Sequence, residues 1–396
     1  LTGRPATTLR EFFERHRAEL LSPGAPAKRT ASAKRTAATG LASPASAAAV
    51  VARLRLEPAP APVRERKDWR PPRKIVLLAF DRRTAGERAG LARVAPQARL
   101  VAAKDRAAAI AAASDADVLI GFNPQICDPA IIDHAKQLRW ILSLAAGVEH
   151  CVAIASVRRR NILITNMRGV DSEAIAEHAI ALTLALAHGL DVFAKDTAAA
   201  RWSQADVARA HMELLDGKTL LVVGLGGIGT DVAQKAHALG MRVIATREHG
   251  HQGPAFVSYV GAPSELLTLA RSADVIVNTA PLTPQTIGLF NARFFSMLKP
   301  TALFINVARG GSVVTADLAR ALRAHHLGGA GLDVVTPEPL PPDNPLWRAP
   351  HVIVTPHIAG RSDLPDSARW IVAREQLRRY AAGDRMLSVV DLAKGY

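Results

Sequence analysis

Hydrophobic and polar residues alternate along most of the chain in blocks that favour strands and helices in turn. Short apolar runs at 74–80, 116–122 and 139–145 are separated by helix-like segments such as 106–114. Such alternation predicts a parallel sheet with helices on both faces. A long helical run over 172–190 then leads out of this first lobe.

The same pattern repeats in a second lobe that begins near residue 218. A strand, a glycine-rich turn, a helix and another strand are predicted over 218–246, and a final helix over 368–383 should return to the first lobe. Further strands of this lobe are predicted at 273–280, 302–308, 328–334 and 351–357. The predicted fold class is therefore α/β, with two Rossmann-like lobes.

Residues 1–72 differ from the rest in composition, because they are rich in Ala, Pro, Ser and Arg. They predict a disordered tail with one short helix at 8–21. Residues 1–73 contain 15 Lys and Arg against 6 Asp and Glu, so +9 of the net charge of +15 lies there. A basic tail could touch nucleic acid or anionic lipid, but it has few aromatic residues for base stacking. We therefore expect no specific nucleic-acid partner.

Composition narrows the classes of protein to which the chain can belong. A chain of 396 residues can bury two full cores, and its mean hydropathy is +0.09. No stretch of about 18 uncharged apolar residues occurs, so no membrane span is expected. Two cysteines, Cys127 and Cys151, cannot form a disulfide framework, and we expect buried thiols in a reducing compartment, the cytoplasm.

The clearest motif is a glycine pattern at the start of the second lobe. Gly224, Gly226 and Gly229 have the G-x-G-x-x-G spacing between a predicted strand and a predicted helix. The first glycine permits a tight turn, the second lets backbone approach a pyrophosphate, and the third lets helix and strand pack closely. The N-terminus of the helix adds free N–H groups for phosphate. The motif predicts dinucleotide binding.

The next predicted strand ends at Thr246 and Arg247, where an NAD-binding site usually has an Asp or Glu for the ribose hydroxyls. A guanidinium there favours the 2′-phosphate of NADP. Glu248 could instead restore an NAD-type contact, and Arg247 could be a solvated loop charge. The cofactor prediction is NADP or NAD, with NADP favoured.

Three polar residues follow strands of the second lobe: Arg309, Glu338 and His357. Because the carboxyl ends of parallel strands share one edge of a sheet, they could meet beside the nicotinamide. Singly, Arg309 could cap a strand, Glu338 could be a solvated acid, and His357 could be a core histidine. Together in a cofactor-binding lobe, they are better explained as a site.

Over residues 74–396 the sequence resembles the D-isomer-specific 2-hydroxyacid dehydrogenase family. The resemblance rests on VVGLGGIG, PLTPQTIGLFNARFFSMLKPTALFINVARG, GLDVVTPEPLPPDNPLW and VIVTPHIAG, in that order. It implies a homodimer whose flavodoxin-like substrate lobe, residues 73–171 and 360–396, is interrupted by a dinucleotide-binding lobe, residues 172–359. No metal and no membrane are implied.

The resemblance also implies residue roles. Arg309 should hold the substrate carboxylate and polarise its 2-carbonyl, and His357 should exchange a proton with the carbonyl oxygen. Glu338 should hold the His357 ring. Substrate-binding backbone is implied at Ala146, Gly147 and Val148, and Glu177 matches a position to which we assign a structural role. Cofactor contacts are implied at Gly224, Gly226, Gly227, Ile228, Gly229, Thr246, Arg247, Thr279, Ala280, Pro281, Thr286, Val307, Ala308, Asp333 and His357.

The implied reaction is NAD(P)-dependent reduction of a small 2-keto acid to the D-2-hydroxy acid, with Phe122 and Asn123 in the side-chain pocket. Glu338 argues against formate oxidation, since formate-oxidising relatives have a glutamine there. A 3-phosphoglycerate dehydrogenase and a non-catalytic, nicotinamide-sensing corepressor scaffold are the alternatives. The basic tail motivates the scaffold.

Overall fold

The computed structural model of the chain describes residues 44–210 and 212–395. The expected helix at 8–21 lies outside them. Within the described residues, 47–395 form one compact unit that contains both predicted lobes. None of the helices in the described part of the chain is long and apolar enough to cross a membrane.

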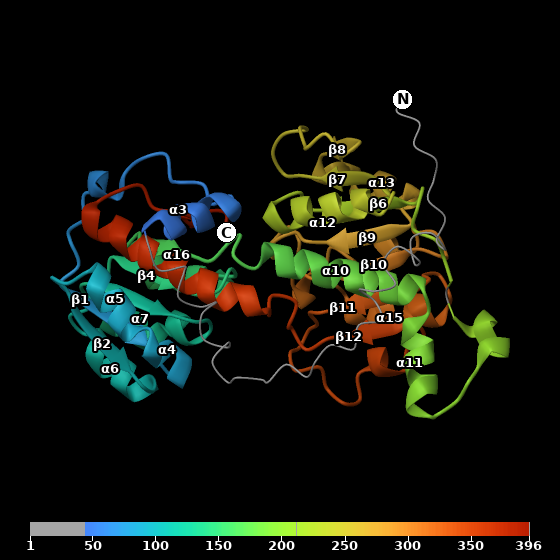
Figure 1. Ribbon diagram of the computed structural model, residues 1–396, viewed down its shortest axis with the longest axis horizontal. Helices are drawn as coiled ribbons and strands as arrows, with labels where there is room; N and C mark the ends of the chain where they lie inside the picture. The colour runs from blue at the N-terminus through green and yellow to red at the C-terminus, as the bar shows by residue number, and fades with distance from the viewer. Residues whose placement is uncertain (1–43, 211, 396) are drawn as a thin grey trace, which may run out of the picture. The chain divides into compact units, whose positions relative to one another are not determined.

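The first lobe is built on five parallel strands in the order β2-β1-β3-β4-β5 (Figure 1). This is the flavodoxin-like order, as predicted. β1, β3 and β4 are entirely buried, because helices cover both faces of the sheet. The strands are β1 (Lys74–Leu78), β2 (Arg99–Ala103), β3 (Val118–Gly121), β4 (Trp140–Ser143) and β5 (Leu163–Thr165).

Helices of the first lobe begin where short acidic side chains can cap them. Asp81, Asp105 and Asp128 each accept a hydrogen bond from a backbone N–H of the helix that follows. α5 and α16 pack on one face of the sheet, and α6, α7 and α9 pack on the other. The helices are α4 (Arg82–Gly86), α5 (Arg88–Val94), α6 (Arg106–Ala113), α7 (Pro129–His134), α8 (Glu149–Ala153), α9 (Ala155–Arg159) and α16 (Asp363–Ala382).

The return of the final helix to the first lobe is confirmed. α16 contributes Trp370, Leu377 and Tyr380 to the core of the first sheet, and the Tyr380 ring stacks on Trp140 with centroids 4.6 Å apart. Burial raises the pKa of the Tyr380 hydroxyl. The first lobe is therefore discontinuous in sequence.

The second lobe is built on seven parallel strands in the order β12-β11-β10-β9-β6-β7-β8. The order reverses between β6 and β9, which is the point where open α/β sheets bind ligands. The strands are β6 (Thr219–Val223), β7 (Arg242–Thr246), β8 (Tyr259–Gly261), β9 (Val275–Asn278), β10 (Leu303–Asn306), β11 (Gly329–Leu332) and β12 (Val352–Val354).

Two apolar clusters form the core of this lobe. α10 and α12 contribute to the cluster on one face of the sheet, and α13, α14 and α15 contribute to the other, where Phe290, Phe294, Phe295 and Phe304 pack together. The helices are α10 (Ser172–Ala187), α11 (Leu190–Ala198), α12 (Gly227–Ala238), α13 (Leu266–Ser272), α14 (Ala292–Phe295) and α15 (Thr315–Arg323).

The prediction of disorder up to residue 72 is wrong for the part that the structure describes. α3 (Pro44–Arg53) is helical, and Leu56 and Val63 are buried in the core of the first lobe. Backbone hydrogen bonds from Ala59 and Val63 reach the segment that follows α16. The large apolar side chains of this Pro- and Arg-rich stretch are few, but Val50, Val51, Leu54 and Trp69 also pack against this core, which sequence composition does not reveal.

Candidate active site

The glycine turn lies between β6 and α12, at the point where the strand order reverses. Gly224 has a φ of +96°, and a Cβ there would lie 2.8 Å from the backbone of Ala280, so only glycine fits. A Cβ on Gly229 would collide with the carbonyl of Gly224, whereas a Cβ on Gly226 would meet nothing within 4 Å. The turn is therefore tight at Gly224, open at Gly226 and closely packed at Gly229. This arrangement fits the pyrophosphate of a dinucleotide.

Most of the other residues predicted to contact the cofactor lie near the ends of strands of this sheet or at the start of α12. Thr246 is buried at the end of β7, and its carbonyl accepts from the N–H groups of Gly224 and Leu225. The Thr279 hydroxyl donates to the carbonyl of Gly224 at 2.7 Å. Gly227 and Ile228 form the first turn of α12, Thr286 donates to the carbonyl of Pro281 at 2.7 Å, and Val307 and Ala308 are buried just after β10.

Arg247 lies at the exposed end of β7. Its Nη1 donates to the carbonyl of Gln252 at 3.2 Å, and Glu248 beside it is also exposed. A guanidinium at this edge can present its remaining N–H groups to a phosphate.

Glu338 and His357 form a hydrogen-bonded pair. His357 Nδ1 lies 2.8 Å from Glu338 Oε2, and both side chains are partly exposed. The other carboxylate oxygen, Oε1, accepts from the N–H of Val335 at 3.2 Å, which fixes the acid on its loop. A carboxylate on Nδ1 favours the tautomer with its proton there and leaves Nε2 for a reactant.

Asp333 determines the backbone that carries His357. Its carboxylate is 2% exposed and accepts from the Thr355 hydroxyl at 2.7 Å and from the N–H groups of Ile358 and Ala359 at 2.9 and 3.0 Å. His357 itself has a φ of +54°, in the left-handed region. The buried acid therefore holds a turn that residues other than glycine seldom adopt.

Arg309 follows β10 and contacts an acid, Glu149, that the sequence analysis did not name. Its Nε donates to Glu149 Oε1 at 2.6 Å, and its Nη1 donates to the carbonyl of Ala308 at 2.8 Å. No hydrogen bond or ion pair joins Arg309 to Glu338 or His357 in the part of the chain that the structure describes. Instead Gly310 packs so closely on the carbonyl of Val335 that a Cβ would collide with it. The two site loops therefore touch through backbone.

The predicted substrate loop, residues 145–148, follows β4. Asn166 Nδ2 donates to the carbonyl of Ala146 at 2.6 Å, and Asn123 Nδ2 donates to the carbonyl of Gly147. Within residues 44–210 and 212–395, the N–H groups of Ala146, Gly147 and Val148 donate to no protein acceptor. Amide side chains thus hold the carbonyls of the loop, while its N–H groups are available to an anion.

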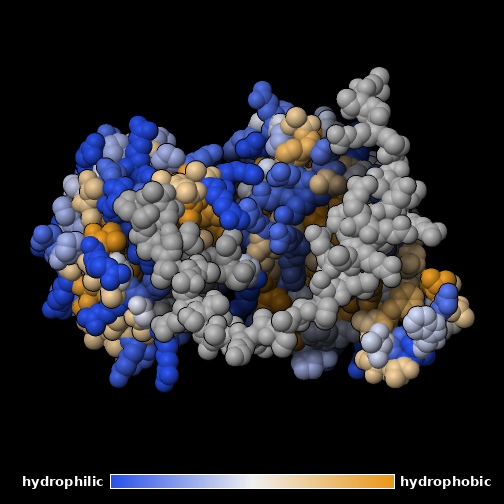
Figure 2. All heavy atoms as spheres, viewed as in Figure 1, coloured by the Kyte–Doolittle hydropathy of each residue, from blue (hydrophilic) through white to orange (hydrophobic). Residues whose placement is uncertain are grey.

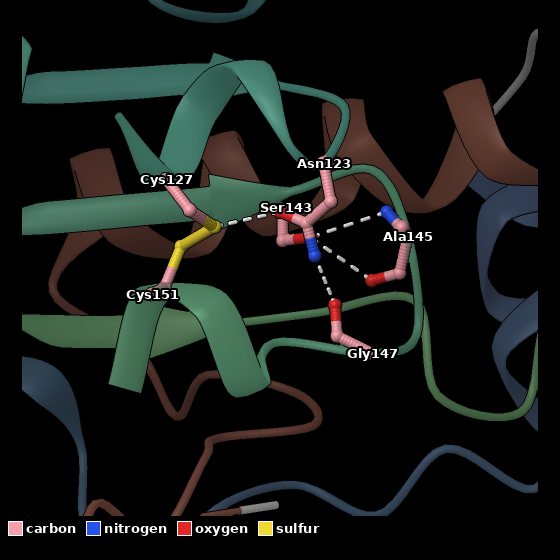
Figure 3. Close-up of a disulfide and its surroundings, with 6 residues drawn as sticks. All are labelled: Asn123, Cys127, Ser143, Ala145, Gly147 and Cys151. Atoms are coloured by element: carbon pink, nitrogen blue, oxygen red, sulfur yellow. Dashed lines mark hydrogen bonds between the residues drawn. A yellow bond between two sulfur atoms is a disulfide. The ribbon is translucent and has the colours of Figure 1, made fainter. Parts of the chain in front are cut away.

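A disulfide lies beside this loop, and the expectation of two free thiols is wrong (Figure 3). Cys127 and Cys151 are bonded, with their Cα atoms 4.5 Å apart. The short helix η2 (Gln125–Cys127) and α8 bring them together, and both residues are buried as predicted. Cys127 Sγ also lies 2.8 Å from Asn123 Oδ1. The positions of the cysteines in the sequence do not predict this bond, because the path of the chain between them decides whether they meet.

Sequence reasoning missed Glu149, the partner of Arg309. Burial opposes the charged form of its carboxyl, yet the Arg309 charge and hydrogen bond outweigh this and lower its pKa. The available signal is a charged residue directly after a loop of small residues that can bind an anion. Glu177, assigned a structural role, bonds to Lys235 of α12 at 3.3 Å. Among the described residues, no group of three or more His, Cys, Asp or Glu could hold a metal ion.

Two family models match the chain. The catalytic domain of D-isomer specific 2-hydroxyacid dehydrogenase matches residues 84–255, and the NAD binding domain of the same family matches residues 180–359. The sequence is 32% identical to the glyoxylate reductase/hydroxypyruvate reductase of Mus musculus, over 67% of this chain and 81% of that protein.

One further relative is much longer than this chain, and one solved structure has the same fold. A D-3-phosphoglycerate dehydrogenase of Archaeoglobus fulgidus is 33% identical over 67% of this chain, which spans about half of that relative's length, 49%. The solved structure of an NADPH-dependent glyoxylate/hydroxypyruvate reductase of Sinorhizobium meliloti, in complex with NADP and sulfate, has a TM-score of 0.69. It is 27% identical, over 82% of this chain and all of that one.

Proposed function

Because this chain belongs to the D-isomer specific 2-hydroxyacid dehydrogenase family, we propose that it reduces a small 2-keto acid to the D-2-hydroxy acid, reversibly and with a nicotinamide cofactor. The observation that carries the proposal is the hydrogen bond between His357 and Glu338 at the carboxyl end of the second sheet, the edge that also carries the glycine turn. Residues 73–171 with 360–396 form the substrate lobe in this proposal, and residues 172–359 form the cofactor lobe.

The nicotinamide supplies the hydride when it is bound, and the chain supplies the proton. His357 Nε2 donates that proton to the carbonyl oxygen of the 2-keto acid, and it accepts the hydroxyl proton in the reverse direction. Glu338 holds the ring through Nδ1 and stabilises the protonated imidazole that donates this proton. Asp333 positions His357 through the turn from Thr355 to Ala359, in addition to the cofactor contact predicted from the sequence.

Two groups of donors bind the charged atoms of the substrate in this proposal. The free N–H groups of Ala146, Gly147 and Val148 bind its carboxylate, a task to which small residues with available amides are suited. Arg309 donates to the carboxylate and to the 2-carbonyl oxygen, where negative charge develops during reduction.

The cofactor is NADP in this proposal. Arg247 stands where NAD-binding sites have an acid, and a planar guanidinium suits a phosphate. The Sinorhizobium meliloti reductase, whose solved structure contains NADP, has the same fold over its whole length. The names of that enzyme and of the mouse relative support glyoxylate and hydroxypyruvate as the first substrates to test.

A homodimer is also proposed, through an arm that we define as residues 189–214. Leu190, Trp202 and Leu214 are exposed on it, Trp202 by 88%. In Figure 2, orange and tan residues lie among blue ones at the lower right, where this arm is placed. Asp196 organises the arm, because it accepts from Ser203, Arg201 and Arg209. Apolar side chains held on such a frame suit burial against a second copy. A cytoplasmic location stays a prediction, and the bond between Cys127 and Cys151 removes the argument from free thiols that favoured it.

The test is an initial-rate assay that follows NADPH and NADH oxidation with glyoxylate, hydroxypyruvate, phenylpyruvate and 2-ketoisocaproate. We expect turnover with one acid and faster rates with NADPH. His357→Ala should reduce turnover at least 1,000-fold, on the order expected when a general acid and its proton are lost, while NADPH still binds. Wild-type protein that binds NADPH but turns over none of the acids would argue against the proposal.

A further inference from the structure

Glu149 is a charged side chain at the site to which the proposed reaction gives no role. It is the first residue of α8 and directly follows the loop whose N–H groups face the substrate. Its Oε1 accepts from Arg309 Nε at 2.6 Å, and the two side chains are 33% and 31% exposed. The carboxyl is ionised at neutral pH because its pKa lies below the ordinary value.

The Arg309 guanidinium has one nitrogen, Nη2, without a protein acceptor among the described residues. Nε bonds to Glu149 and Nη1 bonds to the carbonyl of Ala308. Nη2 points to Gly147, where a Cβ would collide with it and would also lie 2.8 Å from Glu149 Oε2. With two of its three nitrogens held by protein acceptors, the guanidinium has a fixed plane, and its third nitrogen faces the substrate loop.

We propose that Glu149 is a positioning residue, which orients Arg309 so that Nη2 meets the carboxylate of a 2-keto acid at the loop of residues 145–148. The inference rests on the proposed function, since it takes the role of Arg309 from there. Glu149 is itself held, because Cys151 of the same short helix is bonded to Cys127. An acid that is fixed in this way can align Arg309. The arginine side chain has four rotatable bonds, and without the ion pair it would lose more conformational entropy when the substrate binds.

The opposite role would be competition, in which Glu149 occupies the place of the substrate carboxylate and must be displaced. Two features favour positioning. The hydrogen bond to Glu149 uses Nε and leaves Nη2 without a protein acceptor among the described residues. The N–H groups of Ala146, Gly147 and Val148 are also without an acceptor there. The loop therefore still offers a complete cradle for a second carboxylate while the ion pair is formed.

The experiment compares Glu149→Ala with a matched control, Glu87→Ala. Glu87 also bonds to an arginine at 2.6 Å, Arg374, and those side chains are 31% and 27% exposed, but the pair lies between α5 and α16. Two measurements are made on the full chain loaded with NADPH. One is steady-state reduction of the best 2-keto acid, and the other is calorimetric binding of oxamate, a non-reacting 2-keto acid analogue.

Positioning predicts that Glu149→Ala raises the KM of the keto acid and the Kd of oxamate on the order of 10- to 100-fold, the range for losing a hydrogen bond to a charged group. The Kd of NADPH and the Tm should change no more than in Glu87→Ala. Glu149→Gln keeps an acceptor of the same shape and should recover part of the loss. A lower KM and Kd in Glu149→Ala would establish competition instead, and values equal to those of the control would overturn the positioning role.

Failure of the two proposals can be told apart. Wild-type protein that binds oxamate without turning over any keto acid would refute the proposed reaction, and the oxamate affinities of the variants would still decide the role of Glu149. Wild-type protein that neither binds oxamate nor reacts would refute both.

Discussion

Reduction of the Cys127–Cys151 disulfide should destabilise the first lobe by an amount that follows from the loop it closes. The two cysteines are 24 residues apart, and they join η2 to α8 across β4. The loop-closure relation for a loop of this length gives about 3.5 kcal/mol at 25 °C. For a lobe of roughly 140 residues, this corresponds to a decrease in Tm of about 10 °C.

Differential scanning calorimetry with and without a phosphine reductant measures this effect. Proteins of two lobes often depart from two-state unfolding, and we expect the transition of the first lobe to shift while that of the second stays in place. The variant Cys127→Ala/Cys151→Ala is the control, since the reductant has no bond to cleave in it. Thiol titration after denaturation must find two thiols in the reduced wild type. A Tm that stays within about 2 °C despite complete reduction would refute the reasoning.

The other predictions concern single positions. Gly147→Ala should lower kcat/KM for the keto acid at least 100-fold, on the order of losing a charge contact, because the new Cβ collides with Arg309 Nη2; unchanged steady-state kinetics would contradict this. Arg247→Asp should shift the ratio of kcat/KM for NADH and NADPH toward NADH by about tenfold or more, and an unchanged ratio would mean that Arg247 does not contact the 2′-phosphate. Hydrogen bonds from Ser203 and then from Arg201 lower the pKa of Asp196 to about 2 from an ordinary 3.8. The folded pKa is depressed, so the stabilisation of the arm is complete above pH 3.8 and is lost as the pH falls through 2. Fluorescence of Trp202 should report that loss, and a single transition above pH 4 would show that another group controls the arm.

The main elements of the fold could be predicted because their patterns are local. The apolar runs at β1, β3 and β4 and the glycine turn before α12 depend on residues that are adjacent in sequence. Three strands were not predicted. β5 and β8 have only three residues each, and β2 begins with an exposed arginine, so their pairing depends on neighbouring strands that no short pattern encodes.

The contacts of the candidate site also divide into those that the sequence predicts and those that it does not. Glu338 and His357 are 19 residues apart and follow neighbouring strands, so the sheet topology brings them together. Glu149 and Arg309 are 160 residues apart, and neither strand order nor spacing predicts which acid the guanidinium contacts. The ordered stretch at Leu56 and Val63 was missed for a related reason, since its partners lie on α16 and beyond, near residue 386.

The stacking of Tyr380 on Trp140 has a consequence for how the protein is made. A ribosome synthesises β1 to β5 early, but α16, which completes the core of that sheet, emerges only after the whole second lobe. The continuous second lobe can complete its own core first, as domains generally fold during synthesis. Until α16 arrives, the first sheet exposes the apolar face on which it will pack, and during this interval the nascent chain depends most on chaperones.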